Sequence, residues 1–288
     1  YAFLVTYASL PDGWSPGDGA PPVDERPAMD RWALSRLDAT VEHVTARLAD
    51  YDPTAAGRAL EDLVDDLSNW YVRTSRRRFW RSDDRADTAA AFATLHECLT
   101  TVALLAAPFC PFVADEIWDN LVAVHDASAA PSVHLADWPA VGGRRDEDLE
   151  RAMAAAMEAT TLGRSARKEA KLKVRQPLAE AVIACPPATA RALEGLSGIV
   201  AEELNVRAVR FVTDAGGLVE VSLKPNYRTL GPRMGKEMPA MAQAVAALDA
   251  TAAVTALDAG QPVTVSVNGV EQVLHDEDLL REVRPTEG

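Results

Sequence analysis

Cysteine is scarce in this sequence of 288 residues, where it occurs only at Cys98, Cys110 and Cys185. The three are dispersed and show no Cys-x-x-Cys spacing. An odd, scattered set of this kind excludes a disulfide framework and a structural zinc site, and it favours a reducing compartment. We therefore expect a cytoplasmic protein that has no metal site in this chain.

Long apolar runs are lacking too, because no stretch reaches the roughly 18–20 residues that span a bilayer. The opening YAFLVTYASL has neither the basic segment of a signal peptide nor an initiating methionine. We interpret it as the second half of a helix, so that the chain is a fragment of a longer protein. We expect no membrane partner.

The sequence also lacks the common motifs of catalytic and phosphate-binding sites. The sequence contains neither Gly-x-x-x-x-Gly-Lys-Ser/Thr nor Gly-x-Gly-x-x-Gly, so these two kinds of phosphate cradle are not indicated. Its five histidines are too far apart to suggest a metal set, and nothing points to a catalytic triad. We predict no catalytic residue and no cofactor in this chain.

Basic residues are fewer than acidic residues, but many of them gather in three segments. The chain has 29 Lys+Arg against 43 Asp+Glu, a formal net charge of −14. Residues 73–81 nevertheless carry +5, residues 164–175 carry +5 and residues 224–236 carry +4, which leaves −28 on the rest. A negative body repels a polyanion everywhere except at such patches. Arginine pairs with phosphates and aromatic rings stack on unpaired bases, so the pattern favours RNA binding.

The first part of the chain has the apolar spacing of helices. Apolar residues recur at intervals of three and four from Asp30 to Leu48, and Asp52-Pro53 then predicts the start of a second helix, which continues to about Trp80. Residues 1–126 are therefore predicted to form an antiparallel helical bundle. Residues 127–145 read as a connector.

The last part, residues 146–288, is predicted to be a long helix followed by a smaller α+β domain. The long helix runs from about 146 to 172, and short β-type runs follow with a helix at about 188–204 between the first two. Near the end, Asn268-Gly269 joins two such runs and predicts a β-hairpin.

Two interpretations of the aromatic and basic run NWYVRTSRRRFWR (69–81) remain open from composition alone. The run can bind RNA. Alternatively, helical spacing turns Trp70, Tyr71 and Phe79 partly toward the interior, and Arg77 and Arg78 pair with nearby acids, which would make the fragment a structural module.

Several stretches together resemble isoleucyl-tRNA synthetases. DDLSNWYVRTSRRRFWR (65–81) is similar to the signature of the anticodon-binding bundle of that family. Further matches occur in the family's order over about residues 1–240, at DRWALSRL (30–37), LLAAPFCPFVADEIW (104–118), SVHLADWP (132–139), GRSARKEAKLKVRQPL (163–178), EELNVRAV (202–209) and LKPNYRTLGPRMGK (223–236). Valyl- and leucyl-tRNA synthetases share the bundle and remain alternatives.

The resemblance implies the tRNA-binding part of an enzyme that attaches isoleucine to its tRNA with ATP and Mg²⁺. The catalytic and editing domains of such an enzyme have no counterpart here. The implied partners are the isoleucine tRNA and the catalytic core of the same parent chain, in a monomer. The residues expected to bind tRNA are Asn69, Trp70, Arg73, Arg76, Arg77, Arg78, Trp80, Arg81, Lys168, Lys171, Lys173 and Arg175.

The arginines would contact phosphates or base edges, and Trp70 and Trp80 would stack on bases or brace the helix. Many bacterial members of the family end in a cysteine-rich zinc module, whereas no cysteine follows Cys185 here. The sequence is more similar to the form that has a zinc-free α+β extension, so zinc is not carried over. The role of residues 240–288 stays open.

Overall fold

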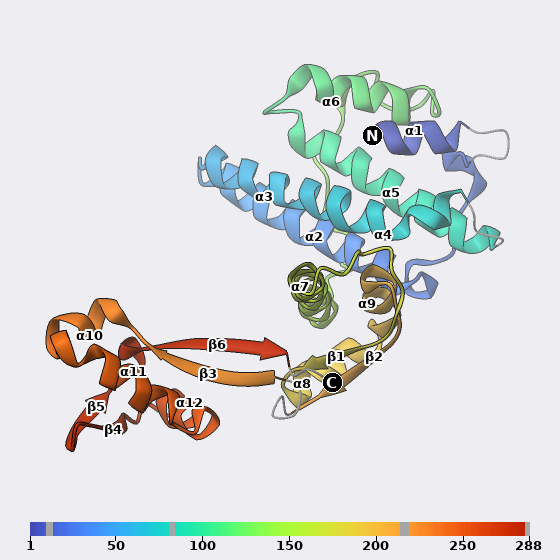
Figure 1. Cartoon of the computed structure of the whole chain (residues 1–288). Helices are drawn as coiled ribbons and strands as arrows, with labels where there is room; N and C mark the ends of the chain where they lie inside the picture. Colours follow the sequence, from blue (N-terminus) through green and yellow to red (C-terminus); the bar gives the residue numbers. More distant parts are fainter. Residues whose placement is uncertain (10–13, 81–83, 214–218, 286–288) are drawn as a thin grey trace. The chain divides into compact units, whose positions relative to one another are not determined.

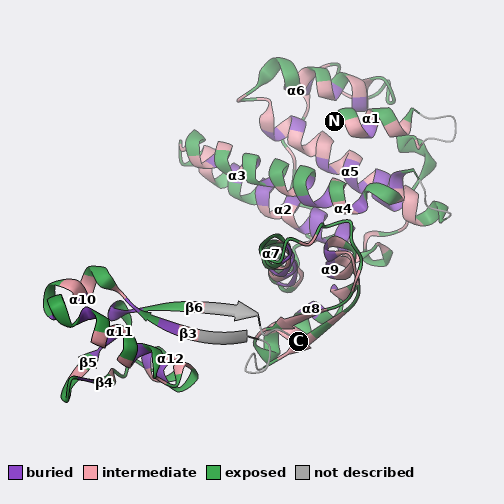
Figure 2. Cartoon of the chain, viewed as in Figure 1, coloured by how far each residue is buried: buried purple, intermediate pink, exposed green. Residues whose placement is uncertain are grey.

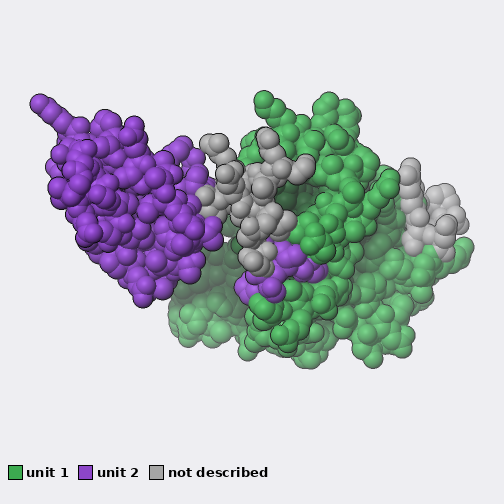
Figure 3. Space-filling model, turned by 60° about the horizontal axis from the view of Figure 1, so that its bottom comes forward, with its two compact units in different colours: residues 1–183, 187–210 green, residues 184–186, 211–288 purple. Residues whose placement is uncertain are grey.

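The computed structural model describes residues 1–9, 14–80, 84–213 and 219–285. The chain divides into two compact units (Figure 3), of which the first comprises residues 1–183 and 187–210 and the second residues 184–186 and 211–288. These units do not follow the expected domain boundaries after residues 126 and 145, because the long helix and the elements after it pack with the helices before it. The expected boundaries stay a prediction.

The first unit is mostly helical, as expected. Its helices up to residue 169 include α1 (Ala2–Ala8), α2 (Ala28–Ala49), α3 (Pro53–Asp65), α5 (Arg85–Ala106), α6 (Pro111–Trp118) and α7 (Glu147–Glu169), drawn in Figure 1. Short 3-10 turns occur at η1 (Pro16–Asp18), η2 (Val23–Glu25) and η6 (Val133–Leu135), and η5 (Asp119–Ala123) is a π-helical turn after α6.

Apolar spacing explains the core of this unit. The side chains of α2 that recur at three- and four-residue intervals are buried up to Val44, as the purple segments of Figure 2 show, and Leu48 is half-buried. Val41 and Val44 of α2 lie in one cluster with Leu60 of α3 and Leu105 of α5. The predicted start of α3 is confirmed, because the side chain of Asp52 accepts a hydrogen bond from the amide of Ala55 at 3.0 Å.

The helix that carries the arginines continues to Phe79 but changes its winding. After α3 it becomes the π-helix η3 (Asp66–Val72), then one α-helical turn, α4 (Arg73–Ser75), and then the 3-10 turn η4 (Arg76–Phe79). Spacing alone predicted a regular helix here. Turns of the π type occur mostly in short pieces and often at functional sites.

A strand–helix–strand element follows α7. It consists of β1 (Leu178–Ala184), α8 (Pro187–Glu194), α9 (Ser197–Leu204) and β2 (Val206–Val212), and β1 pairs with β2. The single helix predicted at about 188–204 is thus two helices, separated by Gly195 and Leu196. Gly163 lets α7 approach α9 closely, because a Cβ atom at that position would lie 2.7 Å from a methyl carbon of Leu204.

The second unit holds the later part of the predicted α+β domain, whereas most of β1 and β2, with α8 and α9, lie in the first unit. The second unit contains β3 (Val219–Pro225), α10 (Tyr227–Met234), η7 (Gly235–Glu237), α11 (Met238–Ala246), α12 (Ala250–Asp258), β4 (Val263–Val267), β5 (Val270–Leu274), η8 (Asp276–Asp278) and β6 (Leu279–Pro285). Strands β3 and β6 pair antiparallel, and so do β4 and β5. The predicted hairpin is confirmed, with positive φ of 50° at Asn268 and 85° at Gly269.

The expectation that no apolar stretch is long enough to span a bilayer is wrong for one helix. By length and composition α5 is apolar enough to cross a membrane, and α10–α12 pass the same test as a bent pair. Within the structure, 44% of the apolar window of α5 is buried, and the helix packs against α2 and α6. Core helices commonly pass this test, and the absence of a membrane partner stays a prediction.

Candidate nucleic-acid interface

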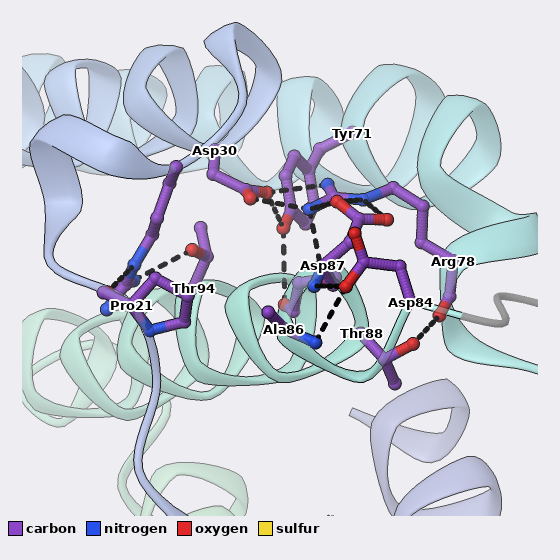
Figure 4. Close-up of polar contacts among 11 residues, drawn as sticks. Pro21, Asp30, Tyr71, Arg78, Asp84, Ala86, Asp87, Thr88 and Thr94 are labelled. Atoms are coloured by element: carbon purple, nitrogen blue, oxygen red, sulfur yellow. Dashed lines mark hydrogen bonds and ion pairs between the residues drawn. The ribbon is translucent and has the colours of Figure 1, made fainter.

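Arg78 is held inside the bundle by two carboxylates, as Figure 4 shows. Its two terminal nitrogens donate to the oxygens of Asp30 at 2.8 and 2.6 Å, and its Nε donates to Asp87 at 2.9 Å. Asp30 is 0% exposed and also accepts a hydrogen bond from the hydroxyl of Tyr71 at 2.6 Å. This arginine therefore ties η4 to α2 and α5.

The charge states in this cluster follow from its burial. Burial alone would lower the pKa of Arg78, but the hydrogen bond and negative charge of Asp30 and the hydrogen bond of Asp87 raise it, so the guanidinium stays protonated. Burial raises the pKa of Tyr71 well above its ordinary value, and the negative charge of Asp30 adds to this. The phenol therefore remains a hydrogen-bond donor.

Trp70 is also internal. Its side chain is 6% exposed, and its Nε1 donates to the sulfur of Met153 on α7 at 3.2 Å. Of the two roles expected for it, stacking on a base or bracing the helix, this burial favours bracing. Phe79 is buried as well, in edge-on contact with Phe92.

The other arginines of the run lie at the surface. Arg73 donates through Nε to the carbonyl oxygen of Asn69 at 2.7 Å, and its guanidinium lies 5.6 Å from the centre of the Trp70 ring. Arg76 lies at the same distance from the ring of Trp80, and the side chain of Arg77 is 81% exposed. Arg81 falls outside the described residues.

Acids of α9 approach two of these arginines, which the sequence analysis missed. Glu203 accepts from Arg73 at 2.8 Å and also from Arg164 of α7, and Glu202 accepts from Arg77 at 3.3 Å. Because Glu203 contacts both, it brings the arginine run of residues 73–81 next to the basic end of α7. Two of the three predicted patches thus form one region.

The second part of this region is the end of α7 and the loop after it. Lys168, Lys171, Lys173 and Arg175 are all exposed, and none forms a salt bridge with a residue in the described ranges. All except Lys171 line a depression of about 620 Å³, together with Arg164, Arg167, Leu172 and Val174. The depression therefore combines apolar side chains with cations.

The third basic patch lies in the second unit, and two of its four cations are paired. Lys224 contacts Glu282 at 2.6 Å, and Arg233 contacts the buried Asp278 at 3.0 Å. Tyr227 is exposed beside Arg228 at the start of α10. Nothing in this patch forms a metal site, and no group of three metal-ligating residues lies together anywhere in the described part of the chain.

Exposed guanidinium and ammonium groups beside apolar side chains suit a ligand that has both phosphates and flat bases. The region contains no arrangement of a nucleophile with a base among the residues named above.

Comparisons with known proteins agree with this interpretation. A protein-family model described as "Anticodon-binding domain of tRNA ligase" matches residues 30–183. The isoleucine–tRNA ligase of Deinococcus radiodurans is 46% identical over all of this chain and 26% of its own length. Those of Thermobifida fusca and Thermus thermophilus are 44% and 42% identical, again over the whole chain, covering 27% and 28% of their lengths.

The chain therefore spans about a quarter of the length of these curated relatives. The matched residues 30–183 include the arginine run, α7 and the basic loop that follows it. By the extent of this match, the chain belongs to the anticodon-binding domain family of tRNA ligases.

Proposed function

We propose that the first unit binds the anticodon stem and loop of a tRNA through one basic surface. This basic surface consists of Arg73, Arg76, Arg77, Lys168, Lys171, Lys173 and Arg175, together with Trp80. It leaves out Trp70 and Arg78 because they are internal, and it includes Asn69 only as the carbonyl that orients Arg73. The expected antiparallel packing of the bundle belongs to the same proposal.

The observation that carries the proposal is the depression beside Lys168, Lys173 and Arg175. Their charges have no carboxylate partner in the described ranges, although the chain as a whole carries −14. On a protein of net negative charge, unpaired cations attract a polyanion to the part of the surface where they gather. Leu172 and Val174 offer apolar contact to an unstacked base.

The parent protein, on this proposal, is an isoleucine–tRNA ligase that uses ATP and Mg²⁺, and this region holds the tRNA so that its acceptor end reaches a distant catalytic core. The names of the relatives support this. Holding one end of a substrate contributes to catalysis by removing translational and rotational freedom. A cytoplasmic location and a monomeric state are part of the same proposal.

A second candidate function is a structural module in which the arginines serve internal ion pairs. The pairing of Arg78 with Asp30, and of Arg73 and Arg77 with glutamates of α9, favours it. Exposed pairs of this kind contribute only about 0–1 kcal/mol each, however. Stability therefore explains Arg78 better than it explains Arg76 or Arg77.

The test measures how the full-length protein binds an isoleucine tRNA transcript, and one with a scrambled anticodon loop, at two salt concentrations. Lys173→Ala/Arg175→Ala should weaken binding and lower the slope of log affinity against log salt by about 1.4–1.8, because each lost phosphate contact removes about 0.7–0.9. The control Arg58→Ala/Arg191→Ala removes the same charge from exposed sites on α3 and α8. If both double variants bind alike, the basic surface is wrongly assigned.

A further inference from the structure

Arg167 is a buried arginine that contacts carbonyl groups instead of carboxylates. It lies in the last turn of α7 and is 5% exposed. One terminal nitrogen donates to the carbonyl oxygens of Lys173 at 3.2 Å and Gln176 at 3.0 Å, and the other to those of Leu204 at 2.7 Å and Asn205 at 3.2 Å. Within the described ranges it forms no salt bridge.

These contacts satisfy the charge of Arg167. A buried cation is costly unless hydrogen bonds surround it, and the planar guanidinium presents five donors in fixed directions. Leu204 is the last residue of α9, where unpaired carbonyl groups carry the partial negative charge of the helix end. The guanidinium therefore joins the end of α9 to the loop of residues 171–176.

Asn205 also holds this loop. Its backbone has a positive φ of 52°, and its Nδ2 donates to the carbonyl oxygen of Val174 at 3.1 Å. Arg167 and Asn205 thus bind the carbonyls of Lys173, Val174 and Gln176. We call these two side chains the carbonyl clamp.

The backbone of the loop is tightly turned within the clamp. Leu172 donates its amide to the carbonyl of Arg167 at 2.8 Å, and Gln176 donates to the carbonyl of Lys173 at 2.9 Å. Lys171 adopts a positive φ of 55°, which a residue with a side chain rarely takes without support. The carbonyls point to the clamp while the side chains of Lys171, Lys173 and Arg175 remain exposed.

We propose that Arg167 and Asn205 are positioning residues, which hold the loop in the form that binds RNA before the RNA arrives. This rests on the proposed function, because it assigns to the clamp the ordering of cations that bind phosphates. A loop already ordered loses less conformational entropy on binding than a mobile one. Neither side chain needs to touch the RNA.

The first test requires no RNA. In the full-length protein, Asn205→Gly removes the bond to Val174 while glycine adopts the same positive φ without strain. Trypsin cuts after lysine and arginine, so the loop offers sites at Lys171, Lys173 and Arg175. We expect the variant to be cut in this loop at least several-fold faster than the unaltered protein, at an unchanged thermal midpoint. Equal rates of cutting overturn the clamp.

A matched control comes from the hairpin of the second unit. Asn268 also has a positive φ, of 50°, so Asn268→Gly makes the same substitution in the same backbone conformation within the other unit. It should leave cutting in the loop unchanged. Arg167→Lys is a second variant of the clamp. Lysine keeps the positive charge, but its single ammonium group cannot donate to all four carbonyl oxygens as the planar guanidinium does. It too should speed cutting.

The second test measures affinity for the tRNA transcript. Asn205→Gly should weaken binding roughly tenfold, about the entropy of ordering one backbone residue. Its salt slope should stay unchanged because every cation is retained, whereas Lys173→Ala should lower the slope by about 0.7–0.9.

Suppose that Asn205→Gly is cut faster but binds the tRNA with unaltered affinity, while Lys173→Ala weakens binding. The loop then contacts the RNA without needing the clamp, and the positioning role is overturned. When Lys173→Ala has no effect either, the loop does not contact RNA, and this part of the proposed function fails together with the inference. A lower salt slope in Asn205→Gly also overturns it, because the side chain would then act through the phosphate contacts themselves.

Discussion

The arginine run contains an internal and an external arginine only two positions apart, which permits a sharp comparison of Arg78→Met with Arg76→Met. Methionine keeps an unbranched side chain in both cases and removes only the guanidinium. Arg78 is 17% exposed and donates to a carboxylate that is 0% exposed, whereas Arg76 is exposed beside the ring of Trp80. The two substitutions should therefore separate stability from RNA binding.

The expected magnitude follows from what each guanidinium leaves behind. Without Arg78, the buried carboxylate of Asp30 loses two donors and keeps one donor among the described residues, the hydroxyl of Tyr71. Removing one partner of a buried pair costs about 3–5 kcal/mol. For a unit of this size, that lowers the thermal midpoint by about 6–20 °C. Removing Arg76 forfeits a surface cation–π contact of about 0.5–1 kcal/mol.

The assay combines thermal unfolding, followed by circular dichroism, with tRNA affinity below the lower midpoint. Arg78→Met should be destabilised and, where folded, should bind with an unchanged salt slope. Arg76→Met should be nearly as stable as the unaltered protein and should lose about 0.7–0.9 of slope. Asp30→Asn in the Arg78→Met background should recover part of the stability, because it removes the uncompensated charge.

Two results would refute this reasoning. If Arg78→Met unfolds at the same temperature as Arg76→Met, the carboxylate of Asp30 does not depend on the guanidinium. If Arg78→Met lowers the salt slope as much as Arg76→Met does, Arg78 reaches the RNA in solution and its internal placement is wrong.

Two further predictions concern packing and ionisation. In Gly163→Ala the new Cβ meets the side chain of Leu204, which costs about 1–3 kcal/mol, while alanine favours the helix over glycine by about 0.5–1 kcal/mol. The free energy of unfolding measured in urea should therefore fall by up to about 2.5 kcal/mol; a variant more stable than the unaltered protein would contradict the close approach of α7 and α9. Because the pKa of Tyr71 is raised in the folded state, its contribution to stability is complete below the unfolded pKa of about 10 and is lost as pH rises above it. Tyr71→Phe should therefore lose less stability than the unaltered protein between about pH 9 and 11, and equal losses would show that the phenol ionises freely.

Local pattern was enough to predict much of this chain. Some features depend only on residues within a few positions of one another, so a short segment of sequence is enough to predict them. These are the helix starts, the cap at Asp52 and the hairpin at Asn268. The burial of Tyr71 was also indicated, because helical spacing turned it inward.

Long-range partners were not predictable in this way. Arg78 pairs with Asp30, which lies 48 residues earlier, and Arg73 pairs with Glu203, which lies 130 residues later. Composition offered many acids as partners and no means of choosing among them. The contacts of Arg167 could not be predicted either, because its partners are backbone carbonyl groups, which every residue has.

The π-helix η3 decides which way the arginines face. Its seven residues, Asp66–Val72, come just before Arg73, and a π turn contains an extra residue compared with an α turn. If all seven residues were instead wound as a regular α-helix, the extra residue would add one α-helical step and rotate everything beyond it by about 100°. Arg76 would turn away from its present direction and Phe79 would leave the core, although every side chain of the run would be unchanged. The winding of this one segment therefore sets the direction of the arginines, independently of the side chains within the run.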